Sequence, residues 1–264
     1  MKQFKIALAS ILCLQFFAQT AGAFDISKMT ENERAAFRAE IRAYLLANPE
    51  VIYEAVDVMQ QRQAQLETKR DLDLVKNNRT AIFSDGHSYV GGNLEGDITL
   101  VEFVDYKCGY CQKAHSEVEE LLARDGNIKL IIKEFPILGE ASIKSAQFAI
   151  AVQQLYGNEF YKAAHDILIS FKGNTTPNAL GRIATALNID KDSVLNHMNS
   201  EAVIAVIQQN RALGQIMEIT GTPTFVLQDE MLRGFVPVDA LHKMVVYHFM
   251  KSIDWHKSTK HFIL

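Results

Sequence analysis

The strongest constraint on this chain is an apolar run that leads into two closely spaced cysteines. Residues 98–104 read Ile-Thr-Leu-Val-Glu-Phe-Val, a pattern typical of a buried strand, and Cys108-Gly109-Tyr110-Cys111 follows shortly. If a helix begins at this motif, the sulfur of Cys108 lies at its N-terminus, where free N–H groups and the helix dipole favour thiolate over thiol. We therefore expect Cys108 to act as a nucleophile. Cys111, one turn further on, is expected to close a short disulfide and release whatever Cys108 has bonded.

Two other uses of such a cysteine pair fit the sequence less well. A structural zinc site needs about four ligands, and His115 is the only nearby candidate for a third, with no second Cys-x-x-Cys in the chain. A purely structural disulfide more often joins distant segments, because closing a two-residue gap removes little chain entropy. The sequence thus predicts a redox-active disulfide between Cys108 and Cys111, with no metal and no cofactor.

Residues 1–23 have the pattern of a cleaved export signal. Two lysines precede an apolar stretch from Ile6 to Ala18, and Ala21-Gly22-Ala23 matches the small-x-small cleavage pattern. The stretch is shorter than the roughly 20 residues that a membrane span requires. We expect cleavage after Ala23, and we assign Cys13 no role beyond filling the apolar stretch. Export also fits a redox motif, because disulfides persist outside the cytosol.

The charge of the exported chain argues against one class of partner. Loss of Lys2 and Lys5 with the leader lowers the number of basic residues from 27 to 25 against 31 acidic residues, a net charge of about −6. The sequence also contains no cluster of basic residues of the kind that binds nucleic acid.

Residues 24–78 are predicted to form an N-terminal helical arm. Thr30 and Glu33 have the spacing of a capping box, and Asn48 and Pro49 are expected to cap and begin a second helix that runs to about Lys76. The apolar positions of this helix alternate by four and three, but its C-terminal half is nearly all polar. The helix therefore either pairs with a second copy, as a homodimer or homotrimer, or stands in solvent. The proposed seam consists of Ile52, Val56, Met59, Gln63, Leu66 and Arg70.

Residues 79–250 read as one α/β domain. We expect a short hairpin over residues 82–90 with a break at Gly91-Gly92, then a parallel strand–helix–strand unit from Ile98 to about residue 132. Residues 139–219 carry helical patterns throughout, and strand patterns return at residues 224–227 and 231–235 before a closing helix over 237–250. Residues 251–264 form a tail with no assigned role.

These features together resemble the thioredoxin-fold Dsb family of bacterial envelope thiol-disulfide oxidoreductases. The match rests on the export signal, the strand that leads into Cys-x-x-Cys, the helical insertion and Gly221-Thr222-Pro223-Thr224-Phe225, and it covers roughly Asp97 to Met250. It implies an α/β, thioredoxin-like fold with an inserted helical domain, in the periplasm. The arm around Ala47-Asn48-Pro49-Glu50 is similar to the DsbA-like subgroup that includes suppressor-of-copper-sensitivity protein C, whose N-terminal extension can oligomerise catalytic domains.

The resemblance also implies roles for single residues. Pro223 is expected to follow a cis peptide bond and to face the cysteines, and with Thr222 it would offer main-chain hydrogen bonds to an extended substrate. Glu102 resembles the family's buried acid, which moves a proton on or off Cys111, and Lys133 is a candidate partner for its charge. Tyr110, between the cysteines, would lie over the thiolate or cap the loop. His115 is expected to face solvent.

The resemblance finally implies a reaction and its partners. Gly109-Tyr110 with Thr222 resembles isomerase-type members more than strong oxidants, which typically carry Pro-His and Val at these positions. We therefore expect an isomerase or reductase of proteins that contain cysteines, kept reduced by a DsbD-like membrane partner. The alternatives are a DsbA-type oxidase served by a DsbB-like partner, or a non-enzymatic chaperone or Cu(I)-binding module.

Overall fold

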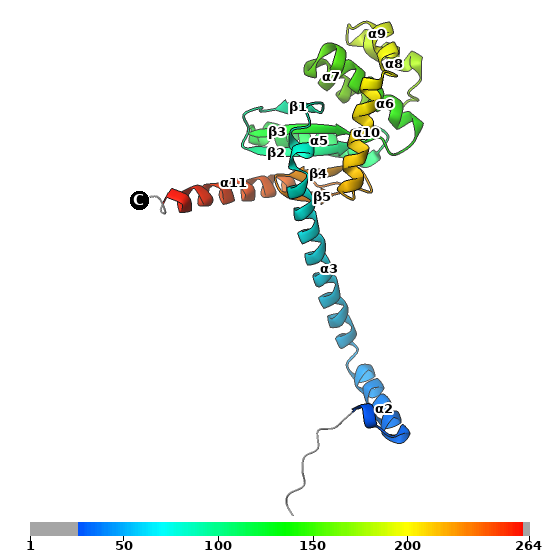
Figure 1. The fold of residues 1–264 in the computed structure, drawn as a ribbon, viewed down its shortest axis with the longest axis vertical. Coiled ribbons are helices and arrows are strands. Elements are labelled where there is room, and N and C mark those ends of the chain that lie inside the picture. Colours follow the sequence, from blue (N-terminus) through cyan, green and yellow to red (C-terminus); the bar gives the residue numbers. More distant parts are fainter. Residues whose placement is uncertain (1–25, 261–264) are drawn as a thin grey trace, which may run out of the picture. The chain divides into compact units, whose positions relative to one another are not determined.

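The structure is a computed structural model that describes residues 26–260 (Figure 1). The chain divides into two compact units, the first ending at Ala64 and the second beginning at Gln65. The predicted export signal, its cleavage after Ala23 and Cys13 lie outside the described residues.

The first unit contains η1 (Ile26–Lys28), α2 (Glu31–Ala47) and the beginning of α3 (Glu50–Asn77). The predicted capping box starts α2, because the Thr30 hydroxyl accepts from the Glu33 N–H and the Glu33 carboxylate accepts from the Thr30 N–H. Asn48 was expected to cap the next helix, but it ends α2 instead, where its side-chain amide donates to the Tyr44 carbonyl at 2.9 Å. Helix α3 accordingly begins at Glu50 rather than at Pro49.

The two arm helices bury almost nothing. Helix α2 has no buried residue, and Val75 is the one buried residue among those of α3. The predicted seam is exposed, with Ile52 at 53% and Met59 at 63%. Apolar side chains at helical spacing are thus exposed along these helices.

A five-stranded mixed sheet forms the centre of the second unit, in the order β1-β3-β2-β4-β5. β2 and β3 are parallel with Ile98 opposite Ile128, as the strand–helix–strand pattern predicted, and β1, β4 and β5 run antiparallel to their neighbours. The strands are β1 (Tyr89–Gly92), β2 (Ile98–Val104), β3 (Ile128–Glu134), β4 (Thr224–Leu227) and β5 (Glu230–Arg233).

The expected hairpin over residues 82–90 is wrong. Ile82 lies in a short helix, α4 (Arg79–Phe83), and β1 pairs with the distant strand β3. Gly91 and Gly92 end β1 rather than following it. Gly92 has φ +65°, and a Cβ there would lie 2.5 Å from the Ile128 carbonyl oxygen, so this strand end requires glycine.

The helices follow the predicted order. Residues 139–219 are helical, and Figure 1 shows α6 to α9 gathered at the N-terminal end of α10. The last helix continues beyond Met250 as far as Lys260, into the stretch that was expected to be a tail. The helices of this unit are α5 (Gly109–Asp125), α6 (Glu140–Tyr156), α7 (Asn158–Ser170), α8 (Pro177–Ala186), α9 (Lys191–His197), α10 (Glu201–Ile216) and α11 (Val238–Lys260).

The two faces of the sheet carry separate cores. Leu100 and Val104 of β2 point to the face that holds both cysteines and the inserted helices. Val101 and Phe103 point to the opposite face, where the end of α3, α4 and the second half of α10 pack. Successive strand residues alternate between the two faces. The even-numbered side chains of β2 therefore point to the core that holds the cysteines, and Val101 and Phe103 point to the other core. Val75 belongs to the second core, so the last turns of α3 are part of this unit.

Candidate active site

Cys108 caps the N-terminus of α5, directly beyond the end of β2. Its carbonyl accepts from the Gln112 N–H at 3.1 Å, and its sulfur lies 3.1 Å from the Thr222 carbonyl oxygen. Cys108 is 8% exposed and Cys111 is fully buried, and the two are not joined by a disulfide. The buried strand thus delivers the first sulfur to the helix terminus, as the sequence predicted.

The two thiols have opposite acidities. A hydrogen bond from the Cys111 side chain outweighs burial and, with the N–H groups of Cys111 and Tyr110, lowers the pKa of Cys108 to about 5. The same hydrogen bond, reinforced by burial, raises the pKa of Cys111 far above its ordinary value. At neutral pH the site therefore holds one thiolate near the surface and one buried thiol beneath it.

Glu102 lies on β2 beneath this site and points to the same face as the cysteines. It is 3% exposed, and burial, followed by the charges of Glu119, Cys108 and Glu134, raises its pKa to about 8. The carboxyl group is close enough for its charge to raise the pKa of Cys111 in turn. At neutral pH Glu102 is thus mostly protonated and able to exchange a proton near its buried neighbour.

A cis peptide bond joins Thr222 to Pro223 at the edge of the site. The Pro223 carbonyl accepts from the Gly234 N–H at 2.9 Å, which ties this turn to the end of β5. Thr222 also lines a shallow hollow of about 220 Å³ with Gly221 and Gly234. The structure therefore brings the Thr222 backbone to the Cys108 sulfur, although the two residues are far apart in the sequence.

Tyr110 is turned outward and is 60% exposed. Its ring lies 6.4 Å from that of Phe235, and the Lys113 ammonium group lies 5.6 Å from the ring centre. An exposed aromatic ring between the two cysteines is available to a bound polypeptide.

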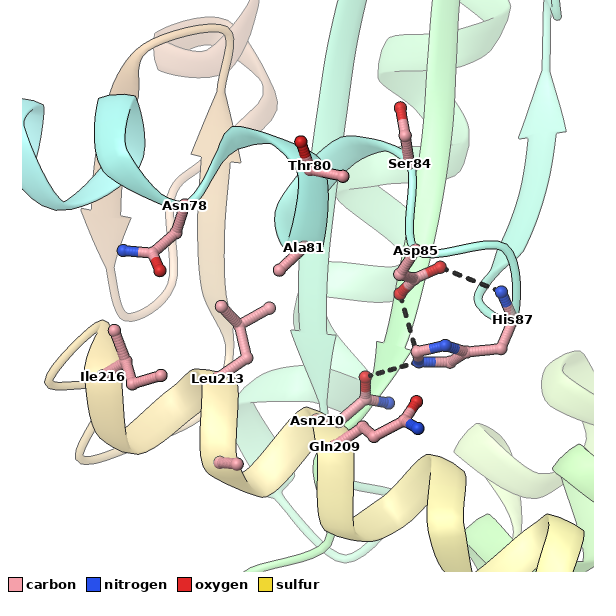
Figure 2. A pocket seen from close by; sticks show the side chains of 11 residues that line it. Asn78, Thr80, Ala81, Ser84, Asp85, His87, Gln209, Asn210, Leu213 and Ile216 are labelled. Atoms are coloured by element: carbon pink, nitrogen blue, oxygen red, sulfur yellow. Dashed lines mark hydrogen bonds and ion pairs between the residues drawn. The ribbon is translucent and has the colours of Figure 1, made fainter.

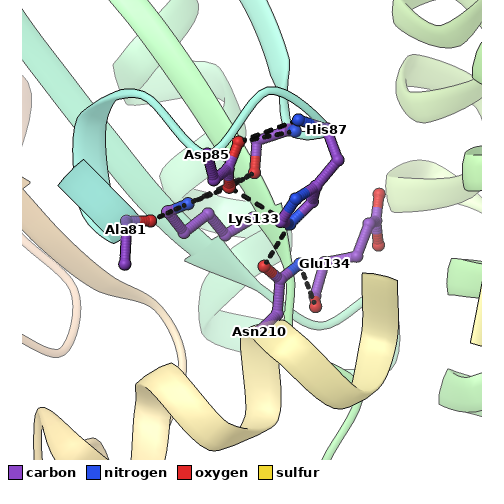
Figure 3. A network of polar contacts seen from close by, with 7 residues as sticks. Ala81, Asp85, His87, Lys133, Glu134 and Asn210 are labelled. Atoms are coloured by element: carbon purple, nitrogen blue, oxygen red, sulfur yellow. Dashed lines mark hydrogen bonds and ion pairs between the residues drawn. The ribbon is translucent and has the colours of Figure 1, made fainter. Parts of the chain in front are cut away.

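The expected pairing of Lys133 with Glu102 is wrong. Lys133 lies opposite Phe103 in the parallel register and points to the other face of the sheet. There its ammonium group is fully buried and binds the Asp85 carboxylate at 2.5 Å, the Ala81 carbonyl at 2.9 Å and the Ser88 hydroxyl at 3.3 Å (Figure 3). The strand pleat, which commits neighbouring residues to opposite faces, keeps the two charges apart.

A larger hollow of about 510 Å³ lies on that second face (Figure 2). Leu213 and Ile216 of α10 form its apolar side, and Asp85 and His87 form its polar side. His87 is already engaged, since its Nε2 lies 3.2 Å from the Asn210 side-chain oxygen and 3.1 Å from the Asp85 carboxylate. The hollow belongs to the core opposite the cysteines.

A buried polar cluster on the cysteine face was not predicted from the sequence. The hydroxyls of Tyr106 and Tyr161 both donate to Glu134 Oε1 at 2.6 Å, and Tyr106 also lies 3.0 Å from His165 Nδ1. Burial raises the pKa of Glu134 to about 8 against the effect of both tyrosines. Tyr161 and His165 share one face of α7 at i, i+4 spacing. This spacing was the only sequence pattern that could have predicted the cluster.

His115 is also placed differently from the expectation. It lies one turn beyond Cys111 but is not turned to solvent, since its side chain is 23% exposed and its ring centre is 5.3 Å from that of His165. Burial lowers the pKa of both imidazoles, so both are neutral at neutral pH.

Residues 99–246 match the family model described as the DSBA-like thioredoxin domain. The chain belongs to this family. Residues 33–65 match a second model, the copper resistance protein ScsC N-terminal domain. The thioredoxin-like fold with a helical insertion and N-terminal helices is thereby confirmed.

Solved structures of DSBA-like proteins support the assignment. The chain is 38% identical to a thioredoxin-like oxidoreductase from Silicibacter pomeroyi, with a TM-score of 0.61 over 66% of this chain and 98% of that one. It is 26% identical to Proteus mirabilis ScsC in a transitional conformation, with a TM-score of 0.62 over 86% of this chain and 100% of that one. The second match includes the arm as well as the catalytic domain.

The curated relatives include a disulfide bond formation protein and two antiporters. Disulfide bond formation protein D of Bacillus subtilis is 24% identical over 58% of this chain and 73% of its own length. The chain spans only about a quarter of two other relatives, Na(+)/H(+) antiporters of Salinispora tropica and Salinispora arenicola (25% and 24% of their length). Within residues 26–260, no helix has the length and apolar character needed to cross a membrane.

Proposed function

We propose that this DSBA-like protein catalyses thiol–disulfide exchange on exported proteins, with Cys108 as nucleophile and Cys111 as the resolving thiol. The observation that carries the proposal is the contrast between the two sulfurs. The pKa of Cys108 is lowered to about 5, which keeps it ionised, whereas burial and hydrogen bonding hold Cys111 as a thiol until it is needed.

The reaction starts when the Cys108 thiolate attacks one sulfur of a substrate disulfide. A mixed disulfide forms, and the other substrate sulfur leaves as a thiolate. In isomerisation, a substrate thiolate attacks the mixed disulfide, forms a new substrate disulfide and restores the Cys108 thiolate. In reduction, Cys111 loses its proton and attacks Cys108, which oxidises the enzyme pair and releases the substrate as a dithiol.

We assign Glu102 to the proton transfer at Cys111. A carboxyl group with a pKa of about 8 can take up or give back a proton near neutral pH, where a carboxyl of ordinary acidity would stay ionised. Thr222 and Pro223 would hold an extended substrate segment beside Cys108 by main-chain hydrogen bonds, with Tyr110 covering it from the outer side.

The most direct test uses the purified protein and a disulfide-bonded model protein. Cys108→Ala should abolish both reduction and reshuffling, whereas Cys111→Ala should still attack and should accumulate mixed disulfides that gel electrophoresis detects. A Cys108→Ala variant as active as the wild type would refute the mechanism.

We assign the direction of the reaction to isomerisation or reduction, with a DsbD-like membrane reductase as the partner. The low pKa of Cys108 equally suits a DsbA-type oxidase, because a stabilised thiolate makes the disulfide a stronger oxidant. Trapping the redox state of Cys108 and Cys111 in cells by thiol alkylation separates the two. A mostly reduced pair supports the isomerase, and a mostly oxidised pair supports the oxidase with a DsbB-like partner.

We further propose that the mature protein begins at Phe24, lies in the periplasm and forms a homodimer or homotrimer through its arm. The exposed apolar side chains of α2 and α3, with Phe37 at 41% and Ile52 at 53%, support this. Full burial of such a side chain contributes about 1.5 to 3 kcal/mol, so several must act together.

A deletion tests the role of the arm. Because Val75 is fully buried in the second core, the deletion should cover residues 24–64 and should keep the last turns of α3. We expect a folded monomer that reduces simple disulfides but has lost isomerase activity on a scrambled substrate. Light scattering that finds the full mature protein monomeric would refute this part and leave the catalytic assignment intact.

A further inference from the structure

Three side chains with metal-binding chemistry meet between the cysteine-bearing helix α5 and the inserted helix α7. One ligand atom from each of His115, His165 and Asp166 lies within 4.8 Å of the other two. His115 Nε2 is 3.4 Å from Asp166 Oδ1. These residues play no part in the proposed thiol chemistry, and the sequence places His115 far from the other two.

The buried polar cluster fixes the orientation and the tautomer of His165. The Tyr106 hydroxyl donates its hydrogen to Glu134 Oε1 at 2.6 Å, so its oxygen is free to accept from His165 Nδ1–H at 3.0 Å. The proton then resides on Nδ1, and Nε2 keeps its lone pair. Histidines that bind metals in proteins are commonly held in this way, with the other nitrogen donating to an oxygen.

We propose that His115, His165 and Asp166 form a binding site for a divalent transition-metal ion of the Zn²⁺ type, with water as the fourth ligand. Two neutral imidazoles and a carboxylate are the donor set that such ions prefer. Ligand atoms around tetrahedral zinc are about 3.4 Å apart, which is the separation already present between His115 Nε2 and Asp166 Oδ1.

The site is partly open to solvent. The side chains of His115 and Asp166 are 23% and 42% exposed, whereas His165 is 2% exposed. An ion can therefore enter from outside, meet His115 and Asp166 first and be anchored by the buried imidazole. A bound ion would join the catalytic helix to the inserted helical domain.

One lysine competes with the metal for the same carboxylate. Lys162 Nζ lies 2.7 Å and 2.9 Å from the two Asp166 oxygens. It also lies 3.1 Å from Glu119 Oε1, so it retains an acidic partner if a metal ion takes Asp166. The affinity for metal should therefore be held down by Lys162, and removal of this lysine should increase it.

The test uses the full mature protein in its oxidised form, in which Cys108 and Cys111 are bonded to each other and cannot act as thiolate ligands. Isothermal titration with Zn²⁺ should show one ion bound per chain. Co²⁺ should give the visible absorption of a tetrahedral site without a sulfur charge-transfer band.

Four variants make the test specific. His115→Gln and Asp166→Asn should each weaken Zn²⁺ binding by about tenfold or more, because each removes a ligand. Lys162→Met should tighten it, an effect that a misfolded variant cannot mimic. His197→Gln, which removes a half-buried histidine at the end of α9, is the matched control and should leave binding unchanged.

Two results would overturn the proposal. One is the absence of Zn²⁺ binding by the oxidised wild-type protein. The other is binding that persists unchanged in His115→Gln and Asp166→Asn and is not tightened by Lys162→Met, which would place the ion elsewhere on the chain.

Discussion

Two buried charged side chains on neighbouring strands have opposite surroundings. Lys133 of β3 is fully buried on one face of the sheet and is satisfied by a carboxylate, a carbonyl and a hydroxyl. Glu102 of β2 is almost as deeply buried on the other face, and it takes part in no ion pair within residues 26–260. The first site stabilises a charge, and the second suppresses one.

The difference separates a structural group from a group that can react. Burial alone would raise the pKa of Asp85, but the charge and hydrogen bond of Lys133 overcome it and lower that pKa to about 2, so the pair stays ionised. Burial raises the pKa of Glu102 to about 8, within the range where protons are exchanged under physiological conditions. A buried charge without a partner is costly and is retained only where its reactivity is useful.

The largest expected effect comes from removing the partner of the buried lysine. Asp85→Ala should lower the free energy of unfolding by about 3 to 5 kcal/mol, because it leaves the Lys133 ammonium group buried and unpaired. Urea denaturation of the variant measures this loss.

Asp239→Ala is the matched control for this change. Asp239 also pairs with a cation, Arg124 at 2.8 Å, but its side chain is 80% exposed. Its loss should change the free energy of unfolding far less than the loss of Asp85 does, because solvent screens an exposed ion pair. Equal losses in the two variants would mean that Lys133 does not depend on Asp85.

The second prediction concerns the pH dependence that Glu102 confers on stability. Its pKa rises from 4.5 to about 8 on folding, so its contribution is complete below pH 4.5 and is lost as pH increases through about 8. In a Cys108→Ala background, the buried carboxyls together should make the free energy of unfolding decline by a few kcal/mol over this pH range, and Glu102→Gln should remove roughly half of that decline. The other half remains, because the pKa of Glu134 is also raised to about 8.

The same variant should affect catalysis at the resolving step. With Cys108 restored, Glu102→Gln should slow the attack by Cys111 about 100-fold and leave the formation of the mixed disulfide unchanged. Rapid quenching of the reaction with acid separates the two steps. A variant that slows both steps equally would assign Glu102 to the structure of the site rather than to proton transfer.

A third prediction gives Glu102 a cationic neighbour, as Asp85 has in Lys133. Ile132 lies directly opposite Glu102 in the parallel register and points to the same face. Ile132→Lys should therefore supply the missing cation and lower the pKa of Glu102, which shifts the pH-dependent loss of stability to lower pH. Ile132→Met has similar length without charge, and its pH profile should match that of the wild type.

The smallest effect is expected at the edge of the lysine site. Ser88 accepts from Lys133 at 3.3 Å and donates to Asp85 at 2.6 Å. Ser88→Ala should cost about 1 kcal/mol, because water or the remaining partners can replace one hydroxyl. A loss as large as that of Asp85→Ala would show that the hydroxyl, rather than the carboxylate, holds the charge.

Local patterns explain which parts of this molecule could be predicted from the sequence. The strand before Cys108, the helix after it and the parallel strand at residues 128–134 each have a periodicity of their own. The hairpin near Ile82 failed because its apolar residues pack against distant elements rather than against each other.

Some residues of the site could be predicted from the sequence and others could not. Cys108 and Cys111 are separated by only two residues in the sequence, and their placement followed from one motif. The partner of Lys133 depends on the register between two strands, which decides the face that each side chain occupies and leaves no trace in either strand alone. The cluster of Tyr106, Glu134, His165 and His115 draws on four elements and has no common spacing.

The two edges of the sheet have a consequence for the proposed function. Both edge strands are only four residues long; β1 ends with two glycines, and β5 begins with Glu230 and ends with Arg233. Arg233 is held in place by Asp71 at 2.7 Å and by the Glu218 carbonyl. Short, charged edges offer another extended chain few free backbone groups to pair with, so the sheet is protected against edge-to-edge aggregation with the unfolded polypeptides that we propose as substrates.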